Sequence, residues 1–233
     1  MSETRFTSGM LVFPNLTQLD LTGPYEVFGR LPDADVMLVG ARPVESDTGL
    51  QLQPDVDFAD APQLDVVCVP GGPGVNGAME SAPLLEFLRH QAEHAAWVTS
   101  VCTGALVLGA AGLLRGYRAT THWLSLDLLA PFGAVPVRER VVIDRNRVTG
   151  GGVTAGIDFG LRLAAELRGE RVAREIQLLL EYDPAPPFSS GSPAEAGREL
   201  VEAIIGKREA LNEERLRIVE RAAAKLNLEA RRA

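Results

Sequence analysis

The chain is poor in cysteine and has no long hydrophobic run. Two cysteines among 233 residues are too few for the disulfide framework of a small secreted domain, which indicates a reducing compartment. No apolar stretch reaches the roughly 18 residues that a membrane-spanning helix needs. Residues 1–9 lack the apolar core of a signal peptide. We therefore expect a cytoplasmic protein with no membrane partner.

Basic residues and histidines are also scarce. Lys and Arg number 23 against 31 Asp and Glu, and the net charge of −8 argues against nucleic acid as a partner. Three histidines and the two cysteines show no close ligand spacing, so we expect no metal site. The remaining composition is typical of a soluble globular protein, because 46% hydrophobic residues are enough for a large core.

Short apolar runs alternate with helical patterns over residues 1–181. The runs at 10–13, 36–41, 66–69 and 95–101 predict strands, and helical patterns follow at 83–94, 104–114, 157–167 and 172–180. A further helix, capped by Thr22, is predicted to run to about Leu31. This alternation predicts one α/β domain, a mostly parallel sheet sandwiched by helices in a flavodoxin-like three-layer arrangement.

The composition changes after residue 181. Residues 182–193 are rich in Pro and Ser and predict an extended linker. Residues 194–233 predict a helical tail whose narrow apolar stripe is formed by Leu211, Ile218, Ala222 and Leu226. Such a stripe packs either on the same domain or on a second subunit. We expect a homodimer and leave both packings of the tail open.

The most informative stretch is residues 95–114, where an apolar strand pattern ends at Cys102 and a helical pattern starts at Gly104. Small residues surround this corner, as in the nucleophile elbow of hydrolases. The following helix N-terminus would lower the pKa of the thiol and hold a developing anion. A free cysteine that only fills the core is the alternative. Cys68, inside an apolar run, is interpreted as such an inert core residue.

Three further side chains are candidates for the same chemistry. Asp20 lies between two leucines after the first predicted strand, where it could pass protons to and from a reacting group or only cap a helix. The Thr103 hydroxyl could bind substrate or water, or cap the helix. His122 could act as a base or polar orienter, or be satisfied by the neighbouring threonine hydroxyls.

A glycine-rich loop follows the strand at 66–69. The letters of residues 72–77 match the dinucleotide pattern G-x-G-x-x-G, but Pro73 removes one N–H and the next helical pattern starts only near residue 83. We therefore expect no dinucleotide there. Either the loop is a tight turn, or Gly71 and Gly72 lend backbone N–H groups to a substrate beside the elbow.

Together these segments resemble the ThiJ/PfpI superfamily, which has the class I glutamine-amidotransferase-like fold. The resemblance rests on residues 18–24 (QLDLTGP), 69–72 (VPGG), 100–104 (SVCTG) and 119–123 (ATTHW), and on 149–158 and 182–193. Within the superfamily the chain is most similar to the isonitrile hydratases. Protease-like members place His after the cysteine, where this chain has Thr103, and many members carry Glu where it has Asp20.

The resemblance implies a cofactor-independent lyase that hydrates a small-molecule isonitrile to an N-substituted formamide. It implies that Cys102 attacks the isonitrile carbon, that Asp20 is the general acid and base, and that Thr103 positions Asp20, substrate or water. Gly151 and Val153 match a segment beside the active site, and family members are typically homodimers. The alternatives are a cysteine redox sensor, a ligand-binding regulatory module and a glyoxalase-type enzyme.

Overall fold

The protein is described by a computed structural model covering residues 5–230. Its main sheet has six strands in the order β2-β1-β5-β6-β10-β9. All neighbouring pairs are parallel except β10 and β9. The strands are β1 (Phe6–Leu11), β2 (Ala34–Val39), β5 (Val66–Val69), β6 (Trp97–Val101), β9 (Val141–Asp144) and β10 (Arg147–Gly150). The predicted α/β fold with a mostly parallel sheet is confirmed.

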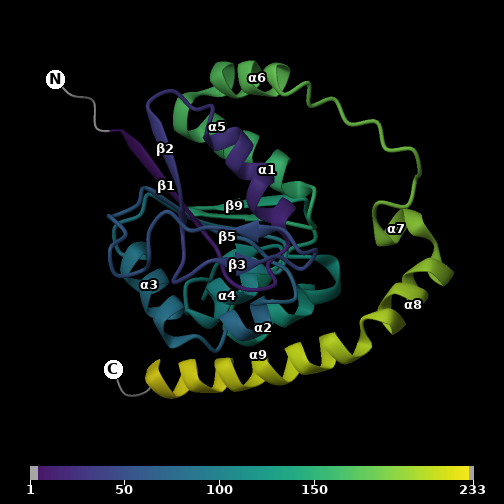
Figure 1. Cartoon of the computed structure of the whole chain (residues 1–233). Helices are drawn as coiled ribbons and strands as arrows, with labels where there is room; N and C mark the ends of the chain where they lie inside the picture. Colours follow the sequence, from purple (N-terminus) through teal and green to yellow (C-terminus); the bar gives the residue numbers. More distant parts are fainter. Residues whose placement is uncertain (1–4, 231–233) are drawn as a thin grey trace.

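Helices cover both faces of this sheet, as Figure 1 shows. One face carries α1 (Gln18–Phe28) and α5 (Ala155–Arg168), which pack on each other, with α6 (Glu170–Leu179) on α5. The other carries α2 (Val75–Ala78), α3 (Ala82–Ala92) and α4 (Gly104–Ala110). Every residue of β5 is buried, which explains its uninterrupted apolar sequence, since a central parallel strand is covered on both sides.

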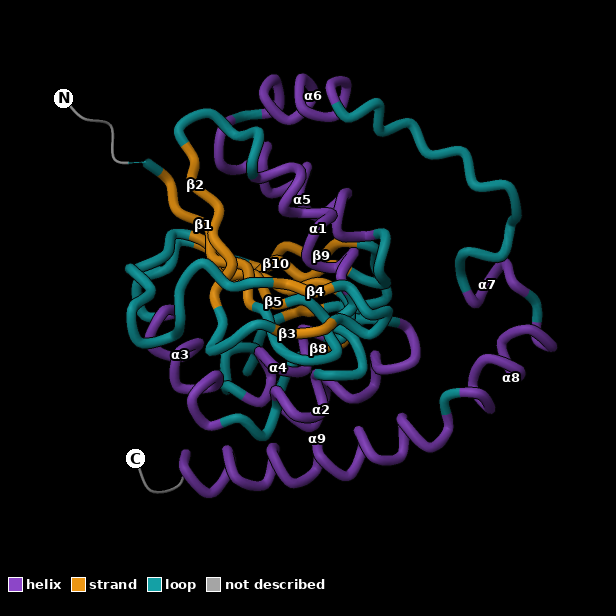
Figure 2. The backbone as a smooth tube through the Cα atoms, in the orientation of Figure 1, coloured by secondary structure: helices purple, strands orange, loops and turns teal. Residues whose placement is uncertain are grey.

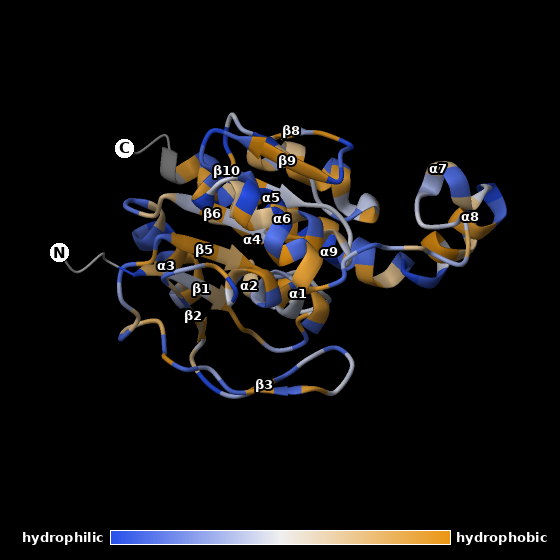
Figure 3. Cartoon of the chain, turned by 90° about the horizontal axis from the view of Figure 1, so that it is seen from above, coloured by the Kyte–Doolittle hydropathy of each residue, from blue (hydrophilic) through white to orange (hydrophobic). Residues whose placement is uncertain are grey.

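Short elements complete the body of the molecule. Two small ladders pair β3 (Val44–Glu45) with β4 (Gln51–Leu52) and β7 (Arg118–Ala119) with β8 (Val135–Pro136). A 3-10 helix, η1, spans Trp123–Phe132. Hydrophobic residues gather in the central strands, and polar residues alternate with them on the covering helices (Figure 3).

The tail wraps around the body and returns to it. After α6 the chain runs without helix or strand to residue 192, which Figure 2 draws as a long loop. Three helices follow, α7 (Pro193–Ala196), α8 (Arg198–Lys207) and α9 (Glu209–Ala230). Helix α9 packs against η1, α4 and α2, where Ile218 and Val219 join the hydrophobic core.

Two local predictions need correction. Helix α1 begins at Gln18, so Thr22 lies inside it and is not its N-cap. The carbonyl of Gly71 accepts a hydrogen bond from the Thr17 N–H (2.9 Å) and so holds the chain where the helix starts. The tail is also not one helix, because Gly197 with φ 78° and Arg208 with φ −110° separate its three segments. No helix among residues 5–230 is both long and apolar enough to cross a membrane.

Candidate active site

The topology brings three loops to one edge of the sheet. Strands β1, β5 and β6 are neighbours and parallel, so their carboxyl ends meet. The segment after β1 contains Asp20, the loop after β5 contains Gly71, and β6 ends next to Cys102. In open α/β sheets this edge is where ligands bind.

Cys102 occupies the sharp corner between β6 and α4. Its φ is 55°, a left-handed value that is unusual for a residue with a side chain. The backbone holds it there, because its N–H donates to the carbonyls of Gly150 (3.1 Å) and Gly151 (2.8 Å). The Thr121 hydroxyl donates to the Cys102 carbonyl (2.7 Å). The elbow predicted from the sequence therefore exists, and the predicted site residue Gly151 acts on it through its carbonyl.

Asp20 is fully buried in the first turn of α1. Its Oδ2 accepts a hydrogen bond from the Gly71 N–H (2.9 Å), while Oδ1 has no partner among the described residues. Burial raises the pKa of Asp20 to about 7, and the Gly71 N–H and the Cys102 thiol lower it only in part. The carboxyl can therefore both accept and release a proton near neutral pH.

The thiol does not have the lowered pKa that the sequence predicted. Burial, and next the negative charge of Asp20, raise the pKa of Cys102 well above its usual value. The backbone N–H of Thr103 opposes this shift without overcoming it. The N-terminus of α4 is thus outweighed by desolvation and by a neighbouring carboxylate. Above pH about 7 the pair therefore holds one proton, on the thiol, and below it the carboxyl is protonated as well.

The glycine-rich loop positions these side chains, and the two N–H groups that the sequence suggested for a substrate, those of Gly71 and Gly72, are both bonded within the protein. The Gly71 N–H is bonded to Asp20, and the Gly72 N–H donates to Thr103 Oγ1 (2.9 Å). A Cβ on Gly71 would lie 2.5 Å from the Thr103 nitrogen and 2.9 Å from Asp20 Oδ2. The loop therefore approaches both residues so closely that only glycine fits.

A cavity of about 250 Å³ opens above Cys102. Thr103, His122, Val153, Gly72 and Pro73 line it from the α/β domain. Its other wall comes from the tail, from residues Ile204, Arg208, Leu211, Asn212 and Arg215. The sequence predicted Val153 at this cavity but none of the tail residues. Cys68 is fully buried in β5 and is not among the residues lining this cavity.

Arg215 is the functional candidate that sequence reasoning missed. Its side chain is buried and donates to Asn76 Oδ1 (3.0 Å), to the Ser125 hydroxyl (3.2 Å) and to the Gly72 carbonyl (3.3 Å). It thereby fastens α9 to the loop that holds Thr103. A signal was present, because Arg215 falls on the apolar stripe between Leu211 and Ile218, at helical spacing from both.

His122 lines the cavity but makes no hydrogen bond to Cys102 among the described residues. Its Nδ1 accepts a bond from the Leu124 N–H (3.3 Å), which leaves Nε2 as the protonated nitrogen. Burial, together with the charges of Arg215 and Arg208, lowers the pKa of His122 to about 4. The imidazole is therefore neutral at physiological pH. The sequence left open hydrogen bonds between His122 and the neighbouring threonine hydroxyls. The structure instead shows the hydrogen bond from the Leu124 backbone N–H.

Among residues 5–230 no group of three or more His, Cys, Asp or Glu side chains could hold a metal ion. The loop at residues 72–77, which matches the dinucleotide pattern in its letters, has Gly74 against the Pro14 carbonyl, with no room there for a Cβ. The Gly74 N–H also donates to the Asn15 carbonyl (2.9 Å), so this part of the loop packs on the chain.

Comparisons with known proteins match this architecture. The family model for the DJ-1/PfpI family matches residues 9–166. Isonitrile hydratase of Pseudomonas putida is 58% identical over 94% of this chain and 97% of its own length. A crystal structure of a ThiJ/PfpI family protein from Pseudomonas syringae superposes with a TM-score of 0.89 at 44% identity, covering 94% of this chain and 90% of that one.

One relative of known structure is shorter than this chain. A DJ-1 superfamily protein from Salmonella typhimurium is 26% identical with a TM-score of 0.69, and the match covers all of that chain but 77% of this one. The family model likewise ends at residue 166, before the tail that forms one wall of the cavity.

Proposed function

Because the chain belongs to the DJ-1/PfpI family, we propose that it is an isonitrile hydratase that converts an isonitrile and water to an N-substituted formamide. The observation that carries this proposal is the buried pair of Cys102 and Asp20 at the base of the cavity that Cys102 lines. The pair provides a nucleophile and a carboxyl whose pKa, about 7, suits proton transfer. The identity to a protein named isonitrile hydratase supports it.

In the first step the Cys102 sulfur attacks the terminal isonitrile carbon. The Asp20 carboxylate takes the thiol proton as the S–C bond forms, so a separate thiolate is not required. The electron pair that remains on the carbon then takes that same proton from Asp20. The product is a thioimidate on Cys102, and Asp20 is again a carboxylate.

In the second step water adds to the C=N bond of the thioimidate. Asp20 accepts a proton from the water as its oxygen bonds to carbon, and that proton passes to nitrogen. The tetrahedral intermediate expels the sulfur, which takes the remaining hydroxyl proton. This releases the formamide and restores the thiol. Each atom is supplied by substrate and water, so the chemistry requires no cofactor.

The surrounding groups position this pair. The Gly71 N–H holds one oxygen of Asp20, which leaves Oδ1 for the thiol and for substrate. Thr103 lines the cavity, and its hydroxyl, which accepts a hydrogen bond from the Gly72 N–H, is our candidate for the group that orients the water. Val153, with Leu124, gives the wall an apolar part for the substituent of the isonitrile. We place this activity in the cytoplasm and in a homodimer.

The test is formamide production from cyclohexyl isonitrile, read by mass spectrometry. Cys102→Ala should abolish turnover, while Cys68→Ala, in the buried strand, should retain it. Intact-mass analysis of the wild type during turnover should show the thioimidate on Cys102. Turnover that survives in Cys102→Ala would contradict the mechanism. Turnover of methylglyoxal alone would indicate glyoxalase chemistry, and peroxide-dependent oxidation without any turnover would indicate a sensor.

A further inference from the structure

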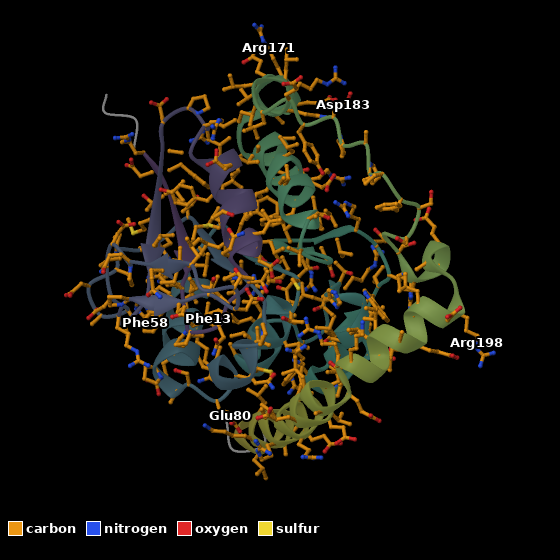
Figure 4. The ribbon with its side chains drawn as sticks, turned by 45° about the vertical axis from the view of Figure 1, so that its right-hand side comes forward. Phe13, Phe58, Glu80, Arg171, Asp183 and Arg198 are labelled. Atoms are coloured by element: carbon orange, nitrogen blue, oxygen red, sulfur yellow. The ribbon has the colours of Figure 1, made fainter. Side chains whose placement is uncertain are left out.

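The arginines of the tail that the structure describes fall into two groups. Arg198, Arg217 and Arg221 pair with Glu202, Glu213 and Glu80, at 2.6, 3.1 and 2.7 Å. Arg208 and Arg215 make no ion pair with the described residues, and these are the two that line the cavity. Figure 4 shows Arg198 pointing away from the molecule and Glu80 beside α9. The two described tail arginines that lack an ion pair therefore both lie at the candidate active site.

We propose that Arg208 selects isonitriles whose substituent carries a carboxylate, with Arg215 adding to the attraction from the cavity wall. This rests on the proposed function and names its substrate class. An anion between two guanidinium groups would neutralise charge that the free protein leaves unpaired.

The two arginines are close enough for their charges to interact. Burial lowers the pKa of Arg215, and the positive charge of Arg208 lowers it further. A negative charge on Cys102 would act in the opposite direction and raise it. Arg208 also contributes to the lowered pKa of His122. Such mutual repulsion is relieved when an anion enters. Arg215 is already committed to three neutral acceptors, so exposed Arg208 is the group able to turn toward a ligand.

The acidic side chains around the cavity do not supply that anion. Asp47, in the cavity wall, accepts a hydrogen bond from the Thr17 hydroxyl (2.7 Å) and forms no ion pair with Arg208 or Arg215 among the described residues. Asp20 is held by Gly71 deeper in the site. Glu214 acts on the pKa of Arg215 but is not part of the cavity lining.

The rest of the cavity suits an apolar spacer between the two ends of such a substrate. Trp123, Leu124, Val153, Ile204 and Leu211 line it. An isonitrile carbon at Cys102 and a carboxylate at Arg208 would place a short alkyl chain or ring against these side chains. The tail lies outside residues 9–166, so this selection would be an addition to the family domain.

The kinetic test compares 4-isocyanobutanoate with its methyl ester, which differ in one charge. The wild type should favour the carboxylate in kcat/KM by about fivefold, as expected for a partly exposed ion pair. Arg208→Gln should remove this preference, and Arg208→Lys should restore part of it. The control is Arg198→Gln, because Arg198 is 90% exposed and paired with Glu202. It should leave the ratio unchanged.

A binding test separates this inference from the proposed function. Calorimetry with Cys102→Ala should show tighter binding of the carboxylate than of the ester, and loss of the difference in Cys102→Ala/Arg208→Gln. Turnover of both substrates at equal kcat/KM, or an unchanged ratio in Arg208→Gln, would overturn the selection and leave the hydratase standing. Selective carboxylate binding without formamide from either compound would overturn the hydratase and keep Arg208 as an anion site.

Discussion

At the scale of single residues, two acids are buried side by side, and burial raises the pKa of both. Asp20 reaches about 7, whereas Cys102 lies well above its usual value. Apparent pKa values of such a pair belong to the pair and not to one residue. The active state is the one with a single proton, because the thiol then has a carboxylate to receive its proton.

The pH dependence of kcat/KM should reveal this state. Below pH about 7 both groups are protonated and no acceptor remains, so kcat/KM should fall about tenfold per pH unit and reach a plateau above 7. Asp20→Asn keeps the size of the side chain and an acceptor for the Gly71 N–H. This substitution should lower kcat/KM at least about a hundredfold and remove the fall in kcat/KM below pH about 7. A wild-type profile that is flat between pH 5 and 8 would contradict the shared proton.

At the scale of elements, α9 gives the cavity a wall and is held there by a buried charge. Arg215→Ala would leave Asn76 Oδ1, the Ser125 hydroxyl and the Gly72 carbonyl without their donor. We expect it to lower the free energy of unfolding by about 3 kcal/mol, as for other buried charged hydrogen-bond networks. Urea titration followed by circular dichroism measures this.

The matched control for Arg215→Ala is Arg217→Ala on the same helix. Arg217 is 66% exposed and only pairs with Glu213 one turn away. Its removal should cost less than about 0.5 kcal/mol. Equal effects of the two substitutions would show that Arg215 does not anchor the tail. A kcat/KM that falls only for Arg215→Ala, together with intact secondary structure, would show that the anchor also serves the site.

At the scale of the whole molecule, apolar side chains remain uncovered far from α9. Leu178 and Leu179 at the end of α6 are 82% and 72% exposed, and Phe188 in the long loop is 77% exposed. Figure 1 places α6 and the start of this loop on the side of the molecule opposite α9. The adjacent Leu178 and Leu179 give this side of the molecule an exposed apolar surface of the kind that contacts other proteins, which supports the proposed homodimer.

Light scattering coupled to gel filtration should therefore give twice the 25.0 kDa of one chain. The double substitution Leu178→Asp/Leu179→Asp should halve that mass, because it would bury two carboxylates in the contact. Arg217→Ala, on the other side of the molecule, should leave the mass unchanged. A single-chain mass for the wild type would refute the dimer, and an unchanged mass for the double variant would place the contact elsewhere.

Much of the fold was predictable because strand and helix patterns are local. The strand at 66–69 and the corner at Cys102 follow from residues adjacent in sequence, whose spacing alone encodes the local structure. The start of α1 was not predictable in this way, because the Thr17 N–H donates to the carbonyl of Gly71, which lies far along the chain. Local capping rules indicated Thr22, and a tertiary contact overrode them.

Some features of the candidate site could likewise be predicted from the sequence, and others could not. Residue type and spacing were enough to select Cys102 and Asp20 and to relate them to a family. The direction of the thiol pKa required the fold, because desolvation depends on what surrounds a side chain and not on its neighbours in sequence. The wall formed by Arg208 and Arg215 likewise depended on a contact between residues 72 and 215, which lie 143 positions apart. Helical spacing marks the face of α9 on which Arg215 lies, but only the folded chain decides that this face meets the loop at Gly72.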